Sequence, residues 1–304
     1  MKPRWRSGAC LLLCGLLVWL LADAGTVRAA AAEGLALCGR AVIPALFPFM
    51  AASTMLVSMG FGEWASPRLA GLMNLYRLPG PAGSALLLGL VGGYPIGART
   101  AAELHKRGLL TVDEAERLLG FSNNSNPVFL ISVLGGGVFG SPRTGVYLWL
   151  IHMLSALLTG FFFRGSGKAP GRQGLPRPAP CQSPSLPAAL VEGIKSACGS
   201  MVSVCGFVIF FYVLASPLAG LGGALGAGLV GALELFSLTP LLAADRVSFI
   251  LASACAGWGG ASILCQTAAA LEGSGLRLRN CVLGKAVQSL LAAGLAAAVS
   301  FYLL

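Results

Sequence analysis

Three asparagine side chains stand close together in a chain that is otherwise strongly apolar. They belong to residues 122–126, which separate the apolar stretches "LLGF" and "VFLISVLGGG". An asparagine amide both donates and accepts hydrogen bonds, but it is costly in lipid unless it faces a wet cavity or a ligand. We therefore expect four neighbours to line a substrate cavity: Asn123, Asn124, Ser125 and Asn126. An ordinary turn outside the membrane is the alternative.

A second candidate group surrounds an interruption in an apolar helix. Gly92, Gly93, Tyr94 and Pro95 interrupt the run, and Arg99 follows about one helical turn later. A backbone break in hydrocarbon leaves polar groups unpaired, so it survives only where a cavity or another segment satisfies them. The half-helix end then offers amide donors, and an arginine offers a bidentate fork to a carboxylate. The alternatives are a kink that eases packing and an arginine that snorkels to the interface, with Glu103 placed to neutralise it from the next turn.

Composition places both groups inside a membrane protein. The chain has 304 residues, of which 56% are hydrophobic and only 11% are charged, whereas a soluble domain usually has about 25% charged residues. Nine apolar runs are long enough, or nearly so, to span a bilayer, which needs about 20 residues. They cover residues 9–22, 41–60, 83–97, 127–140, 146–163, 201–218, 221–235, 249–265 and 281–304. The fold class is therefore an all-α polytopic membrane protein, with a lipid bilayer as its solvent.

The net charge of +10 and the nine cysteines exclude several other classes. The basic residues form short clusters without interleaved aromatic residues, which favours cytoplasmic loops over a nucleic-acid surface. The cysteines contain no CxxC pair, and most lie beside small residues in apolar segments, as Cys198, Cys205, Cys255 and Cys265 do. We expect them to be buried small side chains, with no metal site, cofactor or disulfide. The two histidines lie in different segments and no hydrolase or nucleotide-binding motif is present, so no catalytic residue is predicted.

Two segments divide the chain. Residues 1–24 are predicted to form an N-terminal transmembrane helix or signal anchor, with a cleavable signal peptide as the alternative. Residues 165–187 are rich in Pro, Gly and Ser, which indicates a linker that is neither helix nor membrane span. We expect the linker to be exposed, poorly ordered and cytoplasmic. The remaining residues make two halves, 25–164 and 188–304.

The two halves contain a matching segment. Residues 92–109 align without a gap on residues 259–276, and 9 of the 18 positions are identical. Repeated halves of secondary transporters place discontinuous helices at corresponding positions, where they form the substrate site. We therefore predict two inverted repeats with broken or re-entrant helices, and expect Gly93 to superpose on Gly260. The second break supplies further predicted substrate-binding residues: Trp258, Gly259, Gly260, Ser262 and Gln266.

Several longer stretches resemble a known family. "RAVIPALFPFMAAS", "GLVGGYPIGAR" and "EAERLLGFSNNSNPVFLISVLGGGVFGSPRTGVYLWLIH" resemble the YlbJ-type sporulation integral membrane proteins, which carry a nucleoside-recognition or Gate domain in each half. The resemblance covers nearly the whole chain. It implies a fold like the transport domain of the concentrative nucleoside transporters. The two halves of this chain differ at two points of the repeat. Ala261-Ser262 stands in the second half where the first has Tyr94-Pro95, and Gln266 stands where the first has Arg99, which puts symmetric ligand binding in doubt.

The resemblance also implies a substrate and a location. It implies a carrier that moves the anion dipicolinate from the mother cell across the outer forespore membrane. Arg99, the asparagines and the half-helix ends can supply positive potential and donors for such a flat dianion, while Tyr94 or Trp258 can stack on its ring. The alternatives are a carrier for nucleosides or another small solute, a channel, an intramembrane enzyme and a scaffold of the spore envelope. A homo-oligomer is left open.

Overall fold

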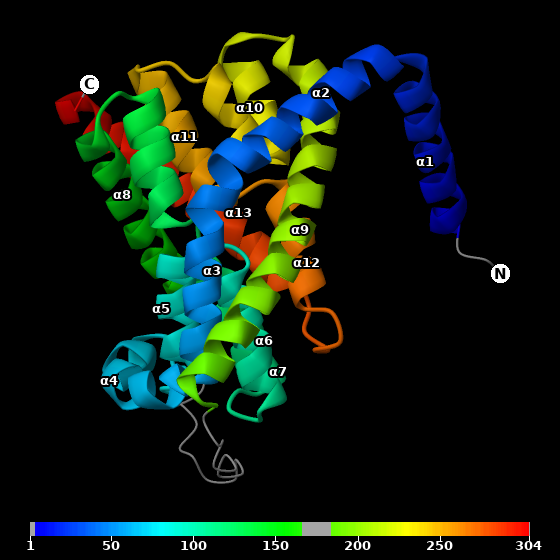
Figure 1. Ribbon diagram of the computed structural model, residues 1–304. Helices are drawn as coiled ribbons and strands as arrows, with labels where there is room; N and C mark the ends of the chain where they lie inside the picture. Colours follow the sequence, from blue (N-terminus) through cyan, green and yellow to red (C-terminus); the bar gives the residue numbers. More distant parts are fainter. Residues whose placement is uncertain (1–3, 166–183, 304) are drawn as a thin grey trace.

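The computed structural model describes residues 4–165 and 184–303, and within them every regular element is a helix. The first half contains α1 (Arg4–Ala22), α2 (Ala24–Leu37), the π-helix η1 (Cys38–Val42), α3 (Ile43–Ser58), α4 (Phe61–Leu75), α5 (Ala82–Gly92), α6 (Ile96–Lys106), α7 (Val112–Ser122), the π-helix η2 (Phe129–Val138) and α8 (Pro142–Phe162). The second half contains α9 (Leu186–Ala219), α10 (Gly223–Leu233), the 3₁₀ helix η3 (Phe236–Leu241), α11 (Arg246–Trp258), α12 (Ala261–Ala270) and α13 (Arg279–Leu303). Figure 1 shows these helices as one body from which α1 leans away.

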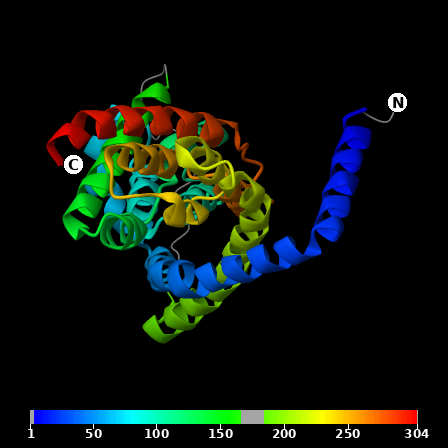
Figure 2. The ribbon, with the colours of Figure 1, turned by 90° about the horizontal axis from the view of Figure 1, so that it is seen from above.

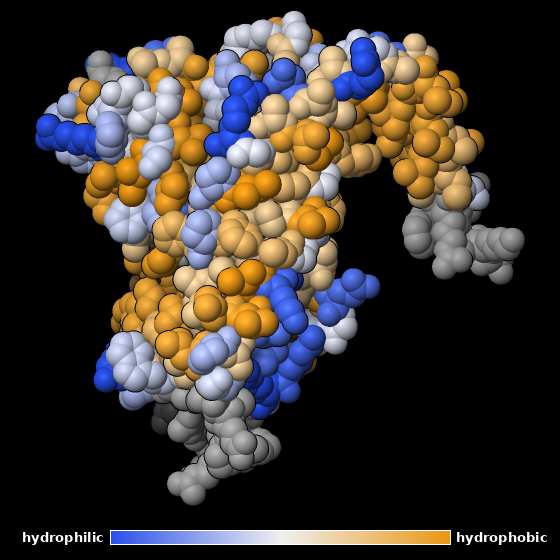
Figure 3. All heavy atoms as spheres, in the orientation of Figure 1, coloured by the Kyte–Doolittle hydropathy of each residue, from blue (hydrophilic) through white to orange (hydrophobic). Residues whose placement is uncertain are grey.

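Five helical segments are long and apolar enough to cross a membrane. They are Ala24–Ser58, Pro142–Phe162, Leu186–Ala219, Arg246–Ala270 and Arg279–Leu303. Their outward side chains include large apolar groups such as Val202 and Leu290, each 76% exposed, which lipid solvates and water does not. Figure 3 shows the face of the molecule that is seen in Figure 1. Apolar residues cover most of the middle of that face, and hydrophilic residues gather toward its ends. The protein is an integral membrane protein with several spans.

The first long span begins earlier than expected from the sequence. The apolar run covers residues 41–60, but α2, η1 and α3 form one helical segment of 35 residues from Ala24. Residues 24–37 are rich in alanine and also contain Arg28 and Glu33, so they look too polar for a span although alanine strongly favours helix. The buried face of α2 packs on α9, where a side chain on Gly34 would approach Tyr212 Cβ to 3.2 Å.

The ends of the linker also differ from expectation. Leu186 and Pro187 were assigned to the linker, but they form the first turn of α9. Proline is accepted there because the first backbone N–H groups of a helix have no partner within it. Residues 166–183 lie outside the described residues, and the expected exposure, disorder and cytoplasmic side of the linker fall largely on them. The expected N-terminal apolar helix is present as α1, which leans away from the body in both views (Figures 1 and 2).

The two predicted helix breaks are present and share a backbone conformation. α5 ends at Gly92 and α6 begins at Ile96, while α11 ends at Trp258 and α12 begins at Ala261. Between them, Gly93 has φ 85° and ψ −170°, and Gly260 has φ 95° and ψ 157°. Only glycine adopts this region without strain. The local repeat therefore extends to the backbone, whereas the inverted symmetry of the whole halves stays a prediction.

The sequence predicts the start of α7 correctly but predicts the burial of the cysteines only in part. The spacing of Thr111 and Glu114 in the sequence predicts a capping box and therefore a helix start, and in the structure these two residues form that capping box at the start of α7. Eight cysteines lie in the described part of the chain and all are free, with Cys38, Cys255 and Cys281 buried. Three cysteines are exposed, contrary to the expected burial, because their helix faces point away from the packed elements: Cys10 and Cys14 on α1 and Cys198 on α9.

Candidate functional site

The two helix breaks contact each other in the interior of the helical body. The hydroxyl of Tyr94, in the first break, donates to the carbonyl oxygen of Ala256 at 3.1 Å, in the last turn of α11. A side chain on Gly259 would come within 3.1 Å of the same hydroxyl. The breaks thus meet although 162 residues separate the bonded pair. Backbone groups freed in both halves face one shared region.

The asparagine loop lies beside the first break and is buried. Residues 123–126 are each at most 2% exposed, so this segment is not a turn in water. Asn126 Nδ2 donates to the carbonyl oxygen of Gly92 at 3.1 Å, and its Oδ1 accepts from the backbone N–H of Val128 at 2.7 Å. One side chain therefore satisfies the end of α5 and the start of the next helix. These hydrogen bonds satisfy backbone groups that the helix break would otherwise leave unpaired in the interior of a membrane protein.

The remaining asparagines connect the loop to the second half. Asn123 Nδ2 donates to Thr267 Oγ1 on α12 at 2.8 Å. Asn124 Oδ1 accepts from Gln288 Nε2 on α13 at 3.0 Å. Both asparagines are fully buried, and Asn123 Oδ1 has no hydrogen-bond partner among the described residues. An acceptor left open in the interior is available to a ligand or to water.

A buried lysine completes this polar cluster. Lys285 on α13 has 0% exposure, and its Nζ donates to Gln288 Oε1 at 2.6 Å and to Tyr94 Oη at 3.3 Å. The amine also lies 5.0 Å from the centroid of the Tyr94 ring. No carboxylate forms an ion pair with Lys285 within residues 4–165 and 184–303. A cation in this position is costly unless something supplies negative charge.

His152 joins the same cluster from α8. Its Nε2 accepts the backbone N–H of Ser125 at 3.0 Å, so the proton of the neutral ring is on Nδ1. His152 Nδ1 is buried with no hydrogen-bond partner among the described residues. Three helices, α7, α8 and α13, therefore converge on the loop. We call Asn123, Asn124, His152, Lys285 and Gln288 the polar cluster.

A small closed cavity adjoins the breaks, and we call it the inner cavity. It has a volume of ≈ 20 Å³, which is room for about one water molecule. Tyr94, Ser125 and Asn126 line it from the first half. Glu234 and Gln266 line it from the second half. Glu234 is 1% exposed, and its Oε2 accepts from the backbone N–H and the hydroxyl of Ser237 at 2.5 and 2.7 Å.

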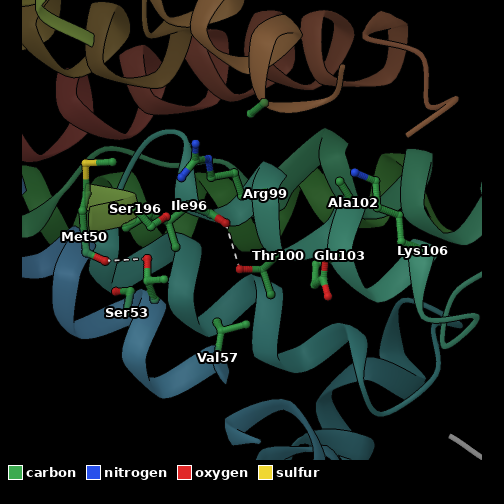
Figure 4. Close-up of a pocket in the computed structure, with 12 residues that line it drawn as sticks. Met50, Ser53, Val57, Ile96, Arg99, Thr100, Ala102, Glu103, Lys106 and Ser196 are labelled. Atoms are coloured by element: carbon green, nitrogen blue, oxygen red, sulfur yellow. Dashed lines mark hydrogen bonds between the residues drawn. The ribbon is translucent and has the colours of Figure 1, made fainter. Parts of the chain in front are cut away.

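A larger cavity, which we call the outer cavity, lies along α6 (Figure 4). It has a volume of ≈ 260 Å³ and is lined by α3, α6, α9 and α12. Arg99 is exposed in it and forms no ion pair with a described residue. The expected pairing of Glu103 with Arg99 is wrong, because the Glu103 carboxylate accepts from Arg107 Nε at 2.7 Å.

The structure brings most of the predicted site residues together and separates two. The glycines at 92, 93, 259 and 260 form the breaks, and Pro95 is the N-cap residue that precedes α6. Gln266 Nε2 donates to Ser262 Oγ at 3.2 Å beside the inner cavity. Arg99 lines the outer cavity instead. Trp258 lines neither cavity, because its ring N–H donates to the Ala232 carbonyl at 2.9 Å. The face of Tyr94 is already covered by Lys285.

Four site residues were not predicted from the sequence: Lys285, Gln288, His152 and Glu234. A signal for three of them was present, because Lys285, Glu234 and His152 are ionisable residues inside the apolar runs 281–304, 221–235 and 146–163. An ionisable side chain within a membrane segment is a functional candidate by default. Gln288 carries no such signal, and its role follows only from its contacts.

One prediction concerns the hydroxyl that joins the two breaks. We expect Tyr94→Phe to lower the free energy of unfolding by about 1–3 kcal/mol, because the Ala256 carbonyl and the Lys285 amine both lose a buried partner. Thermal unfolding of the purified protein in detergent measures this change. Tyr212→Phe is the matched control, since Tyr212 is only half-buried and lies on α9 away from the breaks. Equal unfolding temperatures for the two variants would contradict the bridging role.

The fold and the paired breaks define a polytopic integral membrane protein with a buried polar site. The chain is similar to the Bacillus subtilis (strain 168) protein described as "Sporulation integral membrane protein YlbJ". The two are 28% identical over 312 aligned residues, covering 87% of this chain and 75% of that protein, which makes them distant homologues. No protein-family model matches the chain. No solved structure matches it either.

Proposed function

We propose that this protein carries a small organic anion, dipicolinate, across a membrane of a sporulating cell. The observation that carries the proposal is Lys285, a fully buried amine with no described carboxylate partner, which a substrate carboxylate would keep protonated, where the two helix breaks meet. Homology to a sporulation integral membrane protein supports the cellular setting. In this proposal the protein lies in the outer forespore membrane and moves the anion from the mother cell toward the forespore, without catalysis.

The charge of Lys285 favours an anionic substrate on physical grounds. A structural lysine in the membrane interior is normally paired with a carboxylate of the same protein, because an unpaired charge there is expensive. Here the described neighbours of the amine are a neutral amide and a neutral hydroxyl. A substrate carboxylate would provide the missing charge. In the same polar cluster, the open His152 Nδ1–H can donate to such a carboxylate, whereas the open Asn123 Oδ1 only accepts and would need a substrate donor or water.

The small inner cavity requires a rearrangement before a substrate can bind at the breaks. Its ≈ 20 Å³ has no room for a molecule of the size of dipicolinate, so the surrounding helices have to move apart to admit one. A carrier alternates between conformations that open the site to one side at a time. Tyr94, hydrogen-bonded across both breaks, is the contact that has to separate when the site opens.

Uptake by the purified protein alone tests the proposal. The protein is reconstituted into liposomes, and radiolabelled dipicolinate is added outside with and without unlabelled competitors. We expect saturable uptake that unlabelled dipicolinate abolishes, while protein-free liposomes take up none. Liposomes containing the protein that show only the leak of protein-free liposomes would sink the proposal.

A nucleoside carrier is the second candidate, and the inner cavity is the observation that favours it. Glu234 and Gln266 line that cavity, and a carboxylate beside an amide is suited to the hydroxyl groups of a ribose. The same liposome assay separates the two candidates. Uridine should not compete with dipicolinate if the anion is the substrate. Saturable uptake of labelled uridine that Glu234→Gln abolishes would favour the nucleoside instead.

A further inference from the structure

We infer that the outer cavity is a separate capture site for a small carboxylate anion, from which the anion passes to the helix breaks. This inference rests on the proposed function for the direction of passage. It assigns Arg99 and Lys106 to capture and leaves the polar cluster around Lys285 as the second station. From the sequence, Arg99 and the asparagines were expected to form one site. In the structure Arg99 lines the outer cavity and Asn126 the inner cavity, while Asn123 and Asn124 line neither.

The outer cavity is electropositive. Arg99 and Lys106 both line it, and they are seven residues apart, which places them on the same face of α6. Figure 4 shows the two side chains extending to the same side of this helix. The carboxylate that also lines the cavity belongs to Glu103 and is held by Arg107 at 2.7 Å. Neither lining cation has an ion-pair partner among the described residues.

The size and lining of the outer cavity suit a compact ligand. Its volume of ≈ 260 Å³ lies just below the roughly 300–1,000 Å³ typical of pockets for drug-sized molecules. The hydroxyls of Thr54 and Thr100 donate to carbonyl oxygens of their own helices, each at 2.9 Å. Donors for a ligand carboxylate therefore come mainly from the two cations. A guanidinium can bind a carboxylate with two parallel hydrogen bonds.

The two cavities follow each other along the same helices. On α3, Leu46 lines the inner cavity and Met50 the outer cavity; on α12, Gln266 lines the inner cavity and Ala270 the outer one. Each pair is one helical turn apart. Ser53 also lines the outer cavity, and a side chain on Gly92 would approach its hydroxyl to 2.9 Å. An anion in the outer cavity thus lies next to the end of α5, where the first break begins.

A thiol placed in the cavity measures its charge without assuming any substrate. In Thr54→Cys protein, labelling at residue 54 is followed by mass spectrometry with an anionic and a cationic methanethiosulfonate reagent. We expect the anionic reagent to react at least about tenfold faster, because an electropositive cleft concentrates anions. Adding Arg99→Gln should remove most of this preference, whereas adding Lys195→Gln, an exposed lysine on α9, should preserve it. An unchanged preference in the Arg99→Gln background would overturn the inference.

Dipicolinate then links the cavity to transport. It should protect the thiol at residue 54 from labelling, and Arg99→Gln should raise the KM for uptake by about tenfold or more while leaving the maximal rate nearly unchanged, since capture precedes the later step. A maximal rate that falls with an unchanged KM would contradict a capture role. An anion preference without any dipicolinate uptake would support the capture site while overturning the proposed function.

Discussion

Lys285→Met should abolish dipicolinate uptake and leave the protein at least as stable as the wild type. The amine is fully buried without a described carboxylate partner, so replacing it with a thioether of similar length removes an unfavourable burial of charge. The same change leaves the substrate carboxylate without its cation. Such a loss costs about 2–5 kcal/mol, which corresponds to a decrease in transport of roughly 30-fold or more.

Two measurements separate this outcome from misfolding. Uptake of labelled dipicolinate gives the functional loss, and thermal unfolding in detergent gives the stability. Lys195→Met is the matched control, because Lys195 is exposed on α9 and should affect neither quantity strongly. Uptake at the wild-type rate by Lys285→Met would remove the lysine from the site. A large loss of stability would show instead that the amine holds the fold together.

Gly97→Ala should prevent the first break from packing. The added methyl group would overlap the carbonyl oxygen of Ser122, and a side chain on Gly89 would meet the same oxygen. Since that atom belongs to the backbone that leads into the asparagine loop, it cannot rotate away as a flexible side chain does. Overpacking of a tight contact costs about 1–3 kcal/mol and more where backbone must move. We expect little folded protein in the membrane.

Gly206→Ala provides the contrast within α9. Apart from the backbone of its own helix and its chain neighbours, no described atom lies within 4 Å of the Cβ that a side chain there would add. Alanine in a helix is favoured over glycine by about 0.4–1 kcal/mol when no strain results, so this variant should be as stable as the wild type or slightly more so. The amount of folded protein is measured by fluorescence-detected size-exclusion chromatography. Equal yields of the two variants would contradict the close approach at Gly97.

The helix breaks were predictable because glycine and proline act locally. Gly93 and Gly260 adopt positive φ angles that other residues avoid, and the ungapped match between the halves marks both positions. The start of α7 was predictable for a similar reason, since Thr111 and Glu114 satisfy each other within one turn. Such features depend on a few neighbouring residues. A sequence read in short windows therefore contains them.

The long first span and the partner of Glu103 were not predictable in this way. The alanine-rich α2 is stabilised by packing on α9, where Gly34 meets Ile209 and Tyr212 from a distant part of the chain. Glu103 has an arginine four residues before it, Arg99, and another four residues after it, Arg107. Either one can pair with Glu103 across one helical turn, so the spacing alone does not choose between them. The structure selects Arg107 at 2.7 Å, because Arg99 extends into the outer cavity. That choice decides which cation is left for a ligand.

The sequence by itself determined the class of protein, the two breaks and the polar character of the asparagine loop. Hydrophobicity sums along the chain, and the conformational limits of glycine and proline are local, so neither needs tertiary contacts. Only the tertiary structure decided that Lys285 meets Tyr94 in the first break, that Gln288 meets the asparagine loop, and that Arg99 belongs to a second cavity. These relations depend on which faces of α6, α7 and α13 pack together. Contacts between segments 164 and 191 residues apart set those faces, and no local pattern encodes them.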